Sequence, residues 1–138
     1  FQGFASQFGD LAMLARECRN LKICLVHAGM LTATDSSKVA EWRAALEVLK
    51  PLENVFIKVS GLNTFTRELT PDLMGIAANT VLDMFGPDRC FFGSNYPVER
   101  MWTGFGDYVS AQKDVLTERS ELELLKFFHD TAAGFYSL

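Results

Sequence analysis

Short apolar runs alternate with longer stretches of helical periodicity along this chain. The runs begin near residues 23, 55 and 90, and each ends in small or polar residues. Between them, apolar side chains recur every three or four residues, which is the spacing of one helix face. The separation of the runs, about 30 residues, is enough for a strand, a crossover helix and loops. The pattern predicts parallel strands over 23–27, 55–60 and 90–94, alternating with helices.

The helical stretches carry start and stop signals. Thr70 and Pro71 stand at the N-cap and first helical positions of one stretch, which Gly86 and Pro87 end. Ser120 and Glu123 have the spacing of a capping box. After a short apolar start over residues 1–6, these signals predict helices over 10–18, 39–49, 71–86, 105–116 and 120–129.

Polar side chains follow three successive strands where each strand ends. These residues are His27, Ser60 and Asn95, and the last lies in the segment 89–102, where an apolar strand stops abruptly. In barrels of alternating strands and helices, the carboxyl ends of the strands deliver side chains to the active-site mouth. We therefore expect any functional site at this end of the sheet.

Composition excludes several classes of function. Hydrophobic residues make up 49% of the 138 residues, charged residues 22%, and the net charge is −4, with lysine and arginine scattered. No basic face is built for nucleic acid, and no apolar run approaches the length of a membrane span. The start lacks a secretory pattern, so a cytoplasmic location is expected. The three cysteines, Cys18, Cys24 and Cys90, are odd in number and lie in apolar contexts, which predicts buried reduced thiols.

Four segments of the chain stand in a distinctive order: Val26–Met30, Asn54–Leu62, Phe85–Pro97 and Phe128–Ala133. In this order they resemble motifs of the amidohydrolase-related (amidohydrolase family 2) TIM-barrel hydrolases, in their lactonase-like branch. The resemblance implies an α/β fold, the C-terminal half of a (β/α)8 barrel, with four strands of this chain as strands five to eight. Residues 1–138 then form one partial domain.

A complete barrel needs about 250 residues, roughly twice this length. The chain is expected to be a truncated piece or a half-barrel that completes itself by association, and the sequence leaves both open. An open half-barrel would expose the apolar face meant for the barrel interior. The expected partners are therefore the N-terminal half-barrel or a second copy, together with a small-molecule substrate, and the chain alone is expected to be inactive.

The resemblance assigns roles at the mouth. His27, in the same parity set as Ile23 and Leu25, is expected to point inward as a metal ligand or as a polariser of the scissile carbonyl; the alternative is a histidine hydrogen-bonded beneath a loop. Asn95 stands where relatives more often carry a metal-binding, proton-accepting aspartate, and an amide cannot accept that proton. Gln2 falls where a strand-five ligand can lie. Both amides suit hydrogen bonds to substrate, with a structural role for Asn95 as the alternative.

Three further residues are expected to bind substrate. Lys58 shares a face with Ser60, and the resemblance directs that face inward, where an ammonium needs an anionic ligand or a carboxylate such as Glu99 or Asp130. Ser60 lacks a nucleophile-elbow context and is read as a hydrogen-bonding residue. Tyr96 flanks the mouth.

Together these expectations describe a hydrolase in which water attacks the carbonyl of a lactone or related cyclic ester. His27 and Asn95 would be catalytic, with Gln2, Lys58, Ser60 and Tyr96 on the substrate. A divalent metal, zinc or manganese, could bind a complete barrel through His27. The alternative is a non-catalytic remnant that binds a small molecule or serves only as structure, because Asn95 replaces the aspartate.

Overall fold

A computed structural model describes all residues, 1–138, and contains one parallel sheet. Its three strands are β1 (Ile23–Leu25), β2 (Val55–Val59) and β3 (Cys90–Phe92), in that spatial order. β2 pairs in parallel with both neighbours. The predicted alternation of parallel strands and helices is confirmed, and each strand stops one or two residues earlier than expected.

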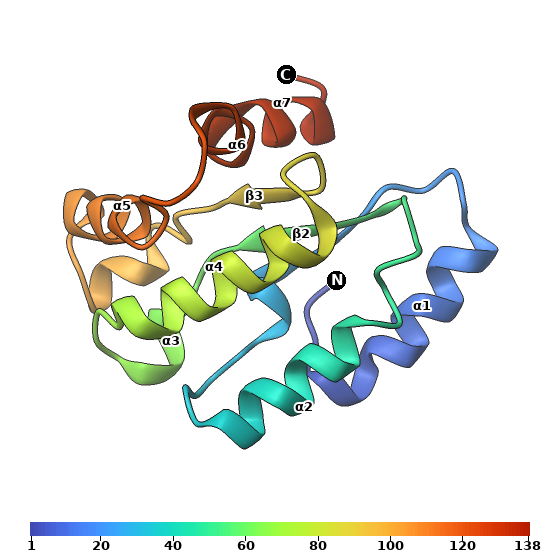
Figure 1. Cartoon of the computed structure of the whole chain (residues 1–138), viewed down its shortest axis with the longest axis horizontal. Helices are drawn as coiled ribbons and strands as arrows, with labels where there is room; N and C mark the ends of the chain where they lie inside the picture. The colour runs from blue at the N-terminus through green and yellow to red at the C-terminus, as the bar shows by residue number, and fades with distance from the viewer.

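Helices connect and flank the strands. In the sequence, α2 (Ser36–Leu46) follows β1, and α4 (Pro71–Phe85) connects β2 to β3. In Figure 1, α4 crosses in front of the sheet. α4 begins at Pro71 and ends before Gly86, as predicted, although the Thr70 side chain does not cap it. The other segments are α1 (Phe8–Glu17), α3 (Asn63–Thr66), α5 (Phe105–Asp114), α6 (Glu121–Leu125), α7 (Thr131–Tyr136), a π-helical turn (Lys126–Asp130) and 3-10 turns at Ala5–Gln7, Val26–Gly29 and Val98–Met101.

The main core lies on one face of the sheet, between the strands and α1, α2 and α4. Alternate strand residues, Ile23, Leu25, Val55, Ile57 and Cys90, point to this side and are buried. We call it the α4 face. The buried strand residues and the apolar residues of the helices form one continuous hydrophobic cluster. This cluster fixes the positions of the strand ends.

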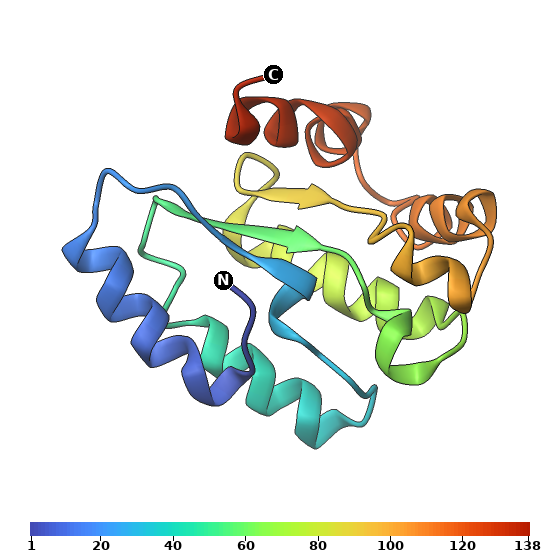
Figure 2. The ribbon, with the colours of Figure 1, turned by 180° about the vertical axis from the view of Figure 1, so that it is seen from behind.

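The opposite face, called the α7 face, carries Cys24, Phe56, Lys58 and Phe91. In Figure 2, the chain start and α7 lie near the edges of this face, and no helix crosses its middle. Phe135 of α7 lies 5.1 Å from Phe56 and 5.5 Å from Phe91, measured between ring centroids, and Phe91 is fully buried. The expectation that this face is wholly exposed is therefore wrong on the β2–β3 side, where α7 covers it.

The first residues do not form the expected fourth strand. The nitrogen of Phe1 donates to the Cys24 carbonyl at 2.7 Å, and Val26 donates to the Phe1 carbonyl at 3.0 Å. Phe1 therefore lies beside β1 as a neighbouring strand would. The chain then turns into the 3-10 segment Ala5–Gln7 and α1, so pairing does not continue.

The Ser120–Glu123 capping box is present, with Ser120 N donating to Glu123 at 3.0 Å and Glu123 N donating to Ser120 at 3.3 Å. All three cysteines are free. The expectation that all are buried is confirmed for Cys90, whereas Cys24 is only partly buried and Cys18, which follows α1, is exposed. No helix has both the length and the apolar character needed to cross a bilayer.

Candidate active site

A small cavity lies at the carboxyl ends of the strands, where the sequence predicts a site. It encloses about 210 Å³. Three of the predicted residues, Gln2, His27 and Asn95, line it together. We call it the strand-end pocket; its remaining lining residues are Gly61, Thr64, Phe65 and Val98.

His27 reaches this pocket through a kink in the backbone. The chain leaves β1 after Leu25, and both His27 and Ala28 have positive φ, 57° and 50°. His27 Nδ1 lies 3.0 Å from Ser60 Oγ and 3.2 Å from the Ser60 carbonyl oxygen. The expectation that His27 continues the direction of Ile23 and Leu25 is therefore wrong: those two side chains point to the α4 face, whereas the kink turns the imidazole toward the end of β2.

The environment of His27 favours its neutral form. Burial lowers the pKa of the imidazole below its ordinary value, because a charged ring loses hydration there. The hydrogen bond to the Ser60 backbone opposes this shift, and the positive charge of Lys58 adds to it. The neutral ring, with one nitrogen bound to Ser60, is therefore the favoured form of His27.

Asn95 is held by a buried carboxylate. Its backbone has a φ of 55°, and its Nδ2 donates to Glu99 Oε2 at 3.2 Å and to Thr64 Oγ1 at 3.3 Å. Glu99 is 0% exposed and also accepts from Thr64 Oγ1 at 3.1 Å and from the Asn63 backbone N–H at 3.0 Å. Sequence reasoning missed this role for Glu99. The available signal was its position four residues after Asn95, on the turn that follows the strand.

Lys58 lies on the α7 face without a carboxylate partner. Its Nζ is 3.4 Å from the Tyr136 hydroxyl and 5.8 Å from the centroid of that ring. The expected pairing with Glu99 or Asp130 is wrong, because Glu99 binds the α3 segment and Asp130 pairs with His129. A Cβ atom on Gly93 would lie 2.3 Å from Lys58 Cε, so the absence of a side chain there leaves room for the lysine.

Ser60 and Tyr96 do not line the strand-end pocket. Ser60 is buried, and its Oγ lies 3.0 Å from His27 Nδ1. The Tyr96 hydroxyl donates to the Thr103 carbonyl at 2.6 Å, and its ring packs edge-on against Phe105 at 5.1 Å. The structure thus gives Ser60 contact with a pocket residue and turns the Tyr96 hydroxyl toward the loop before α5.

The residues of this chain do not suit a divalent metal. The pocket offers one imidazole and two neutral amides, and no group of three histidine, cysteine or carboxylate side chains is close enough to hold an ion. Zinc prefers several nitrogen, sulfur or carboxylate ligands.

We expect the isolated chain to retain well under one equivalent of zinc or manganese after dialysis, because His27 is its only strong ligand in the pocket. Elemental analysis by mass spectrometry measures this, with His27→Ala as the matched control. One full equivalent that disappears in His27→Ala would contradict the expectation.

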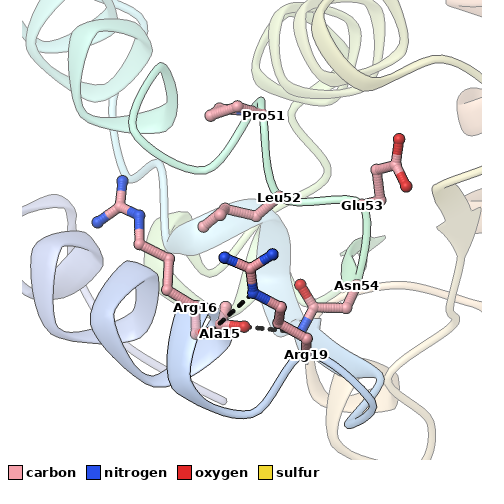
Figure 3. A pocket seen from close by; sticks show the side chains of 7 residues that line it. All are labelled: Ala15, Arg16, Arg19, Pro51, Leu52, Glu53 and Asn54. Carbon is pink, nitrogen blue, oxygen red and sulfur yellow. Dashed lines mark hydrogen bonds between the residues drawn. The ribbon is translucent and has the colours of Figure 1, made fainter.

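A larger cavity, of about 450 Å³, lies at the other end of the sheet (Figure 3). Arg16 in the last turn of α1, and Arg19 and Glu53 on the loops that precede β1 and β2, line it. Asn54 crosses beneath it and donates to the carbonyls of Ala15, Cys18 and Leu21 at 3.0–3.1 Å. These bonds hold α1 to the start of β2, so this end of the sheet is structural.

Comparison with known proteins places these features in a family. Residues 1–138 match the model of the Amidohydrolase family. The chain is 32% identical to an uncharacterised protein of Sinorhizobium fredii, over 94% of this chain and 43% of that protein. It is 36% identical to an L-fucono-1,5-lactonase of Burkholderia multivorans, over 75% of this chain and 38% of that protein.

The fold is shared with solved amidohydrolases. A Burkholderia multivorans amidohydrolase crystallised with bound zinc superposes with a TM-score of 0.86 at 31% identity, over 98% of this chain and 50% of that chain. The chain thus spans about half the length of the proteins it matches. It belongs to the amidohydrolase family, and its fold is the C-terminal half of a (β/α)8 barrel.

Proposed function

We propose that a complete barrel containing this chain hydrolyses a lactone or related cyclic ester by attack of water on its carbonyl. The observation that carries the proposal is the strand-end pocket, which brings His27, Asn95 and Gln2 together. Family membership supports a hydrolase. Relatives named L-fucono-1,5-lactonase, 35% and 36% identical to this chain, support the lactone as substrate class.

The residues divide the work by their chemistry. The neutral imidazole of His27 acts on the reacting groups, since it is half-buried in the pocket and fixed by Ser60. Asn95 and Gln2 supply neutral hydrogen-bonding groups. Lys58, whose side chain passes over Gly93 next to Ser60, supplies a positive charge that suits a carboxylate of the substrate.

One observation favours a second candidate, a pocket that binds a small molecule without reaction. Asn95 has no basic carboxylate, and its amide nitrogen is committed to Glu99 and Thr64. The two candidates differ in turnover. The test is to join this chain to the N-terminal half of a relative's barrel and incubate it with a panel of sugar lactones. Ring opening that depends on enzyme supports the hydrolase, whereas saturable binding without ring opening supports the second candidate.

The missing partner is part of the proposal. β3 is an edge strand, and Phe1 and Tyr136 at the borders of the α7 face are 41% and 49% exposed. We propose that the N-terminal half of the barrel covers this face, and that a second copy of the chain substitutes for it when the chain is alone.

The isolated chain is therefore expected to be a dimer or larger species in size-exclusion chromatography with light scattering. Tyr136→Glu places a charge on the α7 face and should shift the population toward monomer. Met13→Glu, at a position on α1 that is 58% exposed, serves as the control and should not. A wild-type monomer at every concentration tested would rule out self-association.

Lys58 should discriminate between substrates by charge. In a complete barrel, Lys58→Met is expected to raise KM about tenfold for a lactone that carries a carboxylate, because a lost charge-assisted hydrogen bond costs about 1.5 kcal/mol. A neutral lactone should be almost unaffected. Lys38→Met, on the exposed side of α2, is the control. Equal effects on both substrates would count against an anion anchor.

A further inference from the structure

The hydrogen bonds of His27 determine which of its nitrogens can accept a proton. A carbonyl oxygen can only accept, so the 3.2 Å contact with the Ser60 carbonyl places the hydrogen of the neutral ring on Nδ1. Ser60 Oγ, 3.0 Å away, can accept from the same hydrogen. Nε2 then carries the lone pair, because both hydrogen bonds of the ring are made through Nδ1. The imidazole therefore presents an acceptor.

The hydrogen bonds of Asn95 determine which end of its amide is free. The Glu99 carboxylate accepts only, so the amide nitrogen faces it at 3.2 Å. Thr64 donates its hydroxyl hydrogen to Glu99 at 3.1 Å and accepts the second amide hydrogen of Asn95 at 3.3 Å. Both hydrogens of the amide are then used, and Oδ1 is left as a second acceptor, because both side-chain hydrogen bonds of Asn95 are made through Nδ2.

Gly61 brings these two side chains close together. A Cβ atom on this residue would lie 2.4 Å from His27 Nδ1 and 3.0 Å from Asn95 Nδ2. Its φ of 64° is in the region that favours glycine. The imidazole and the amide therefore flank the same backbone position and line the same cavity of about 210 Å³.

We propose that His27 is the general base of the hydrolysis and that the attacking water lies between His27 Nε2 and Asn95 Oδ1. This inference rests on the proposed function and identifies the base for it. A water molecule has two hydrogens, which match the two free acceptors, and its oxygen lone pair remains for the carbonyl carbon. Ser60 and Glu99 are positioning residues, because they act through His27 and Asn95. Polarisation of the carbonyl by neutral His27, the role expected from sequence, would need a hydrogen on Nε2.

The hydrolysis proceeds in two steps, addition of water to the carbonyl and opening of the ring. The water oxygen bonds to the carbonyl carbon, one water proton moves to Nε2, and the carbonyl π electrons move to the oxygen. Collapse of this intermediate breaks the ring C–O bond, and the leaving alkoxide takes the proton from Nε2. One water is consumed, the imidazole returns to its neutral form, and the product is a hydroxy acid.

The tautomer can be measured on the chain itself, without activity. The sequence contains two histidines, His27 and His129, so ¹⁵N-histidine labelling gives few signals, and His129→Gln assigns them. At a pH where His27 is neutral, we expect its Nδ1 to be protonated and its Nε2 to be unprotonated. A neutral ring protonated at Nε2 would overturn the assignment of the base.

Chemical rescue separates a base from a hydrogen-bond donor in the complete barrel. In His27→Ala, imidazole and 1-methylimidazole should both restore lactone hydrolysis, by about tenfold or more, because both carry an acceptor nitrogen. Neutral 1-methylimidazole has no N–H to donate, so rescue by imidazole alone would overturn the proposal. If the wild-type barrel opens no lactone, the proposed function fails, and the labelling result still decides the tautomer.

Discussion

Replacing His27 by alanine in a complete barrel is expected to lower kcat/KM for lactone hydrolysis about 100-fold or more. The side chain acts on the reacting groups, whereas its packing contribution is limited because the ring is only half-buried at the edge of a small pocket. The free energy of unfolding should fall by no more than about 1 kcal/mol, the usual net worth of one hydrogen bond. Activity per folded molecule and urea unfolding measure the two effects.

The control for this substitution is the other histidine. The His129 side chain is 73% exposed, and its ring is hydrogen-bonded to Asp130 in the turn before α7. His129→Ala should leave both activity and stability near wild type. If His27→Ala instead unfolds the protein while activity per folded molecule is unchanged, His27 is a structural histidine, which the sequence also allowed.

Periodic features of the sequence predicted the scaffold well. Helix α4 begins at Pro71 and ends at Phe85 before Gly86, because proline suits the first helical position and glycine follows helix ends easily. The parallel strands follow from apolar runs about 30 residues apart. These signals are local, so a single sequence contains them.

The direction of the site residues could not be predicted in the same way. The His27 side chain does not follow the alternation of the strand, because His27 and Ala28 adopt positive φ. A histidine or an alanine in the sequence does not indicate this conformation. The sequence offers Glu99 and Asp130 as partners for Lys58, but its Nζ instead lies 3.4 Å from the hydroxyl of Tyr136, which is 78 residues away in sequence. Contacts of this kind depend on how α7 crosses the sheet, and no local pattern specifies that.

The convergence of Gln2, His27 and Asn95 was predictable for a topological reason. Carboxyl ends of parallel strands meet at one edge of a sheet, so polar residues that end successive strands become neighbours. Gln2 joins them even though the first residues form no strand, since Phe1 is hydrogen-bonded to Cys24 of β1 and to Val26 just after it. Tyr96 follows Asn95 directly but turns away, because its hydroxyl is bound to Thr103.

The buried carboxylate of Glu99, which supports the pocket residues Thr64 and Asn95, is expected to be highly sensitive to truncation. It is 0% exposed and accepts from three donors, those of Asn63, Thr64 and Asn95. An unsatisfied buried polar group costs about 1–3 kcal/mol, and water entering the space left by the side chain would satisfy some of these donors. Glu99→Ala should therefore lower the free energy of unfolding of the chain by about 3 kcal/mol.

Glu99→Gln is the matched variant, because it keeps the shape and separates stability from activity. The glutamine oxygen can still accept from the Asn63 backbone, and its amide can donate to Thr64 and Asn95. Accepting that donation would turn the Asn95 oxygen away from the strand-end pocket and present its nitrogen there. Stability should stay within about 1 kcal/mol of wild type, while kcat in a complete barrel falls and KM changes little. Both variants can be compared by urea unfolding. If the free energy of unfolding falls equally and only slightly in both, the carboxylate does not hold these donors. If kcat is unchanged in Glu99→Gln, the orientation of Asn95 does not matter to the reaction.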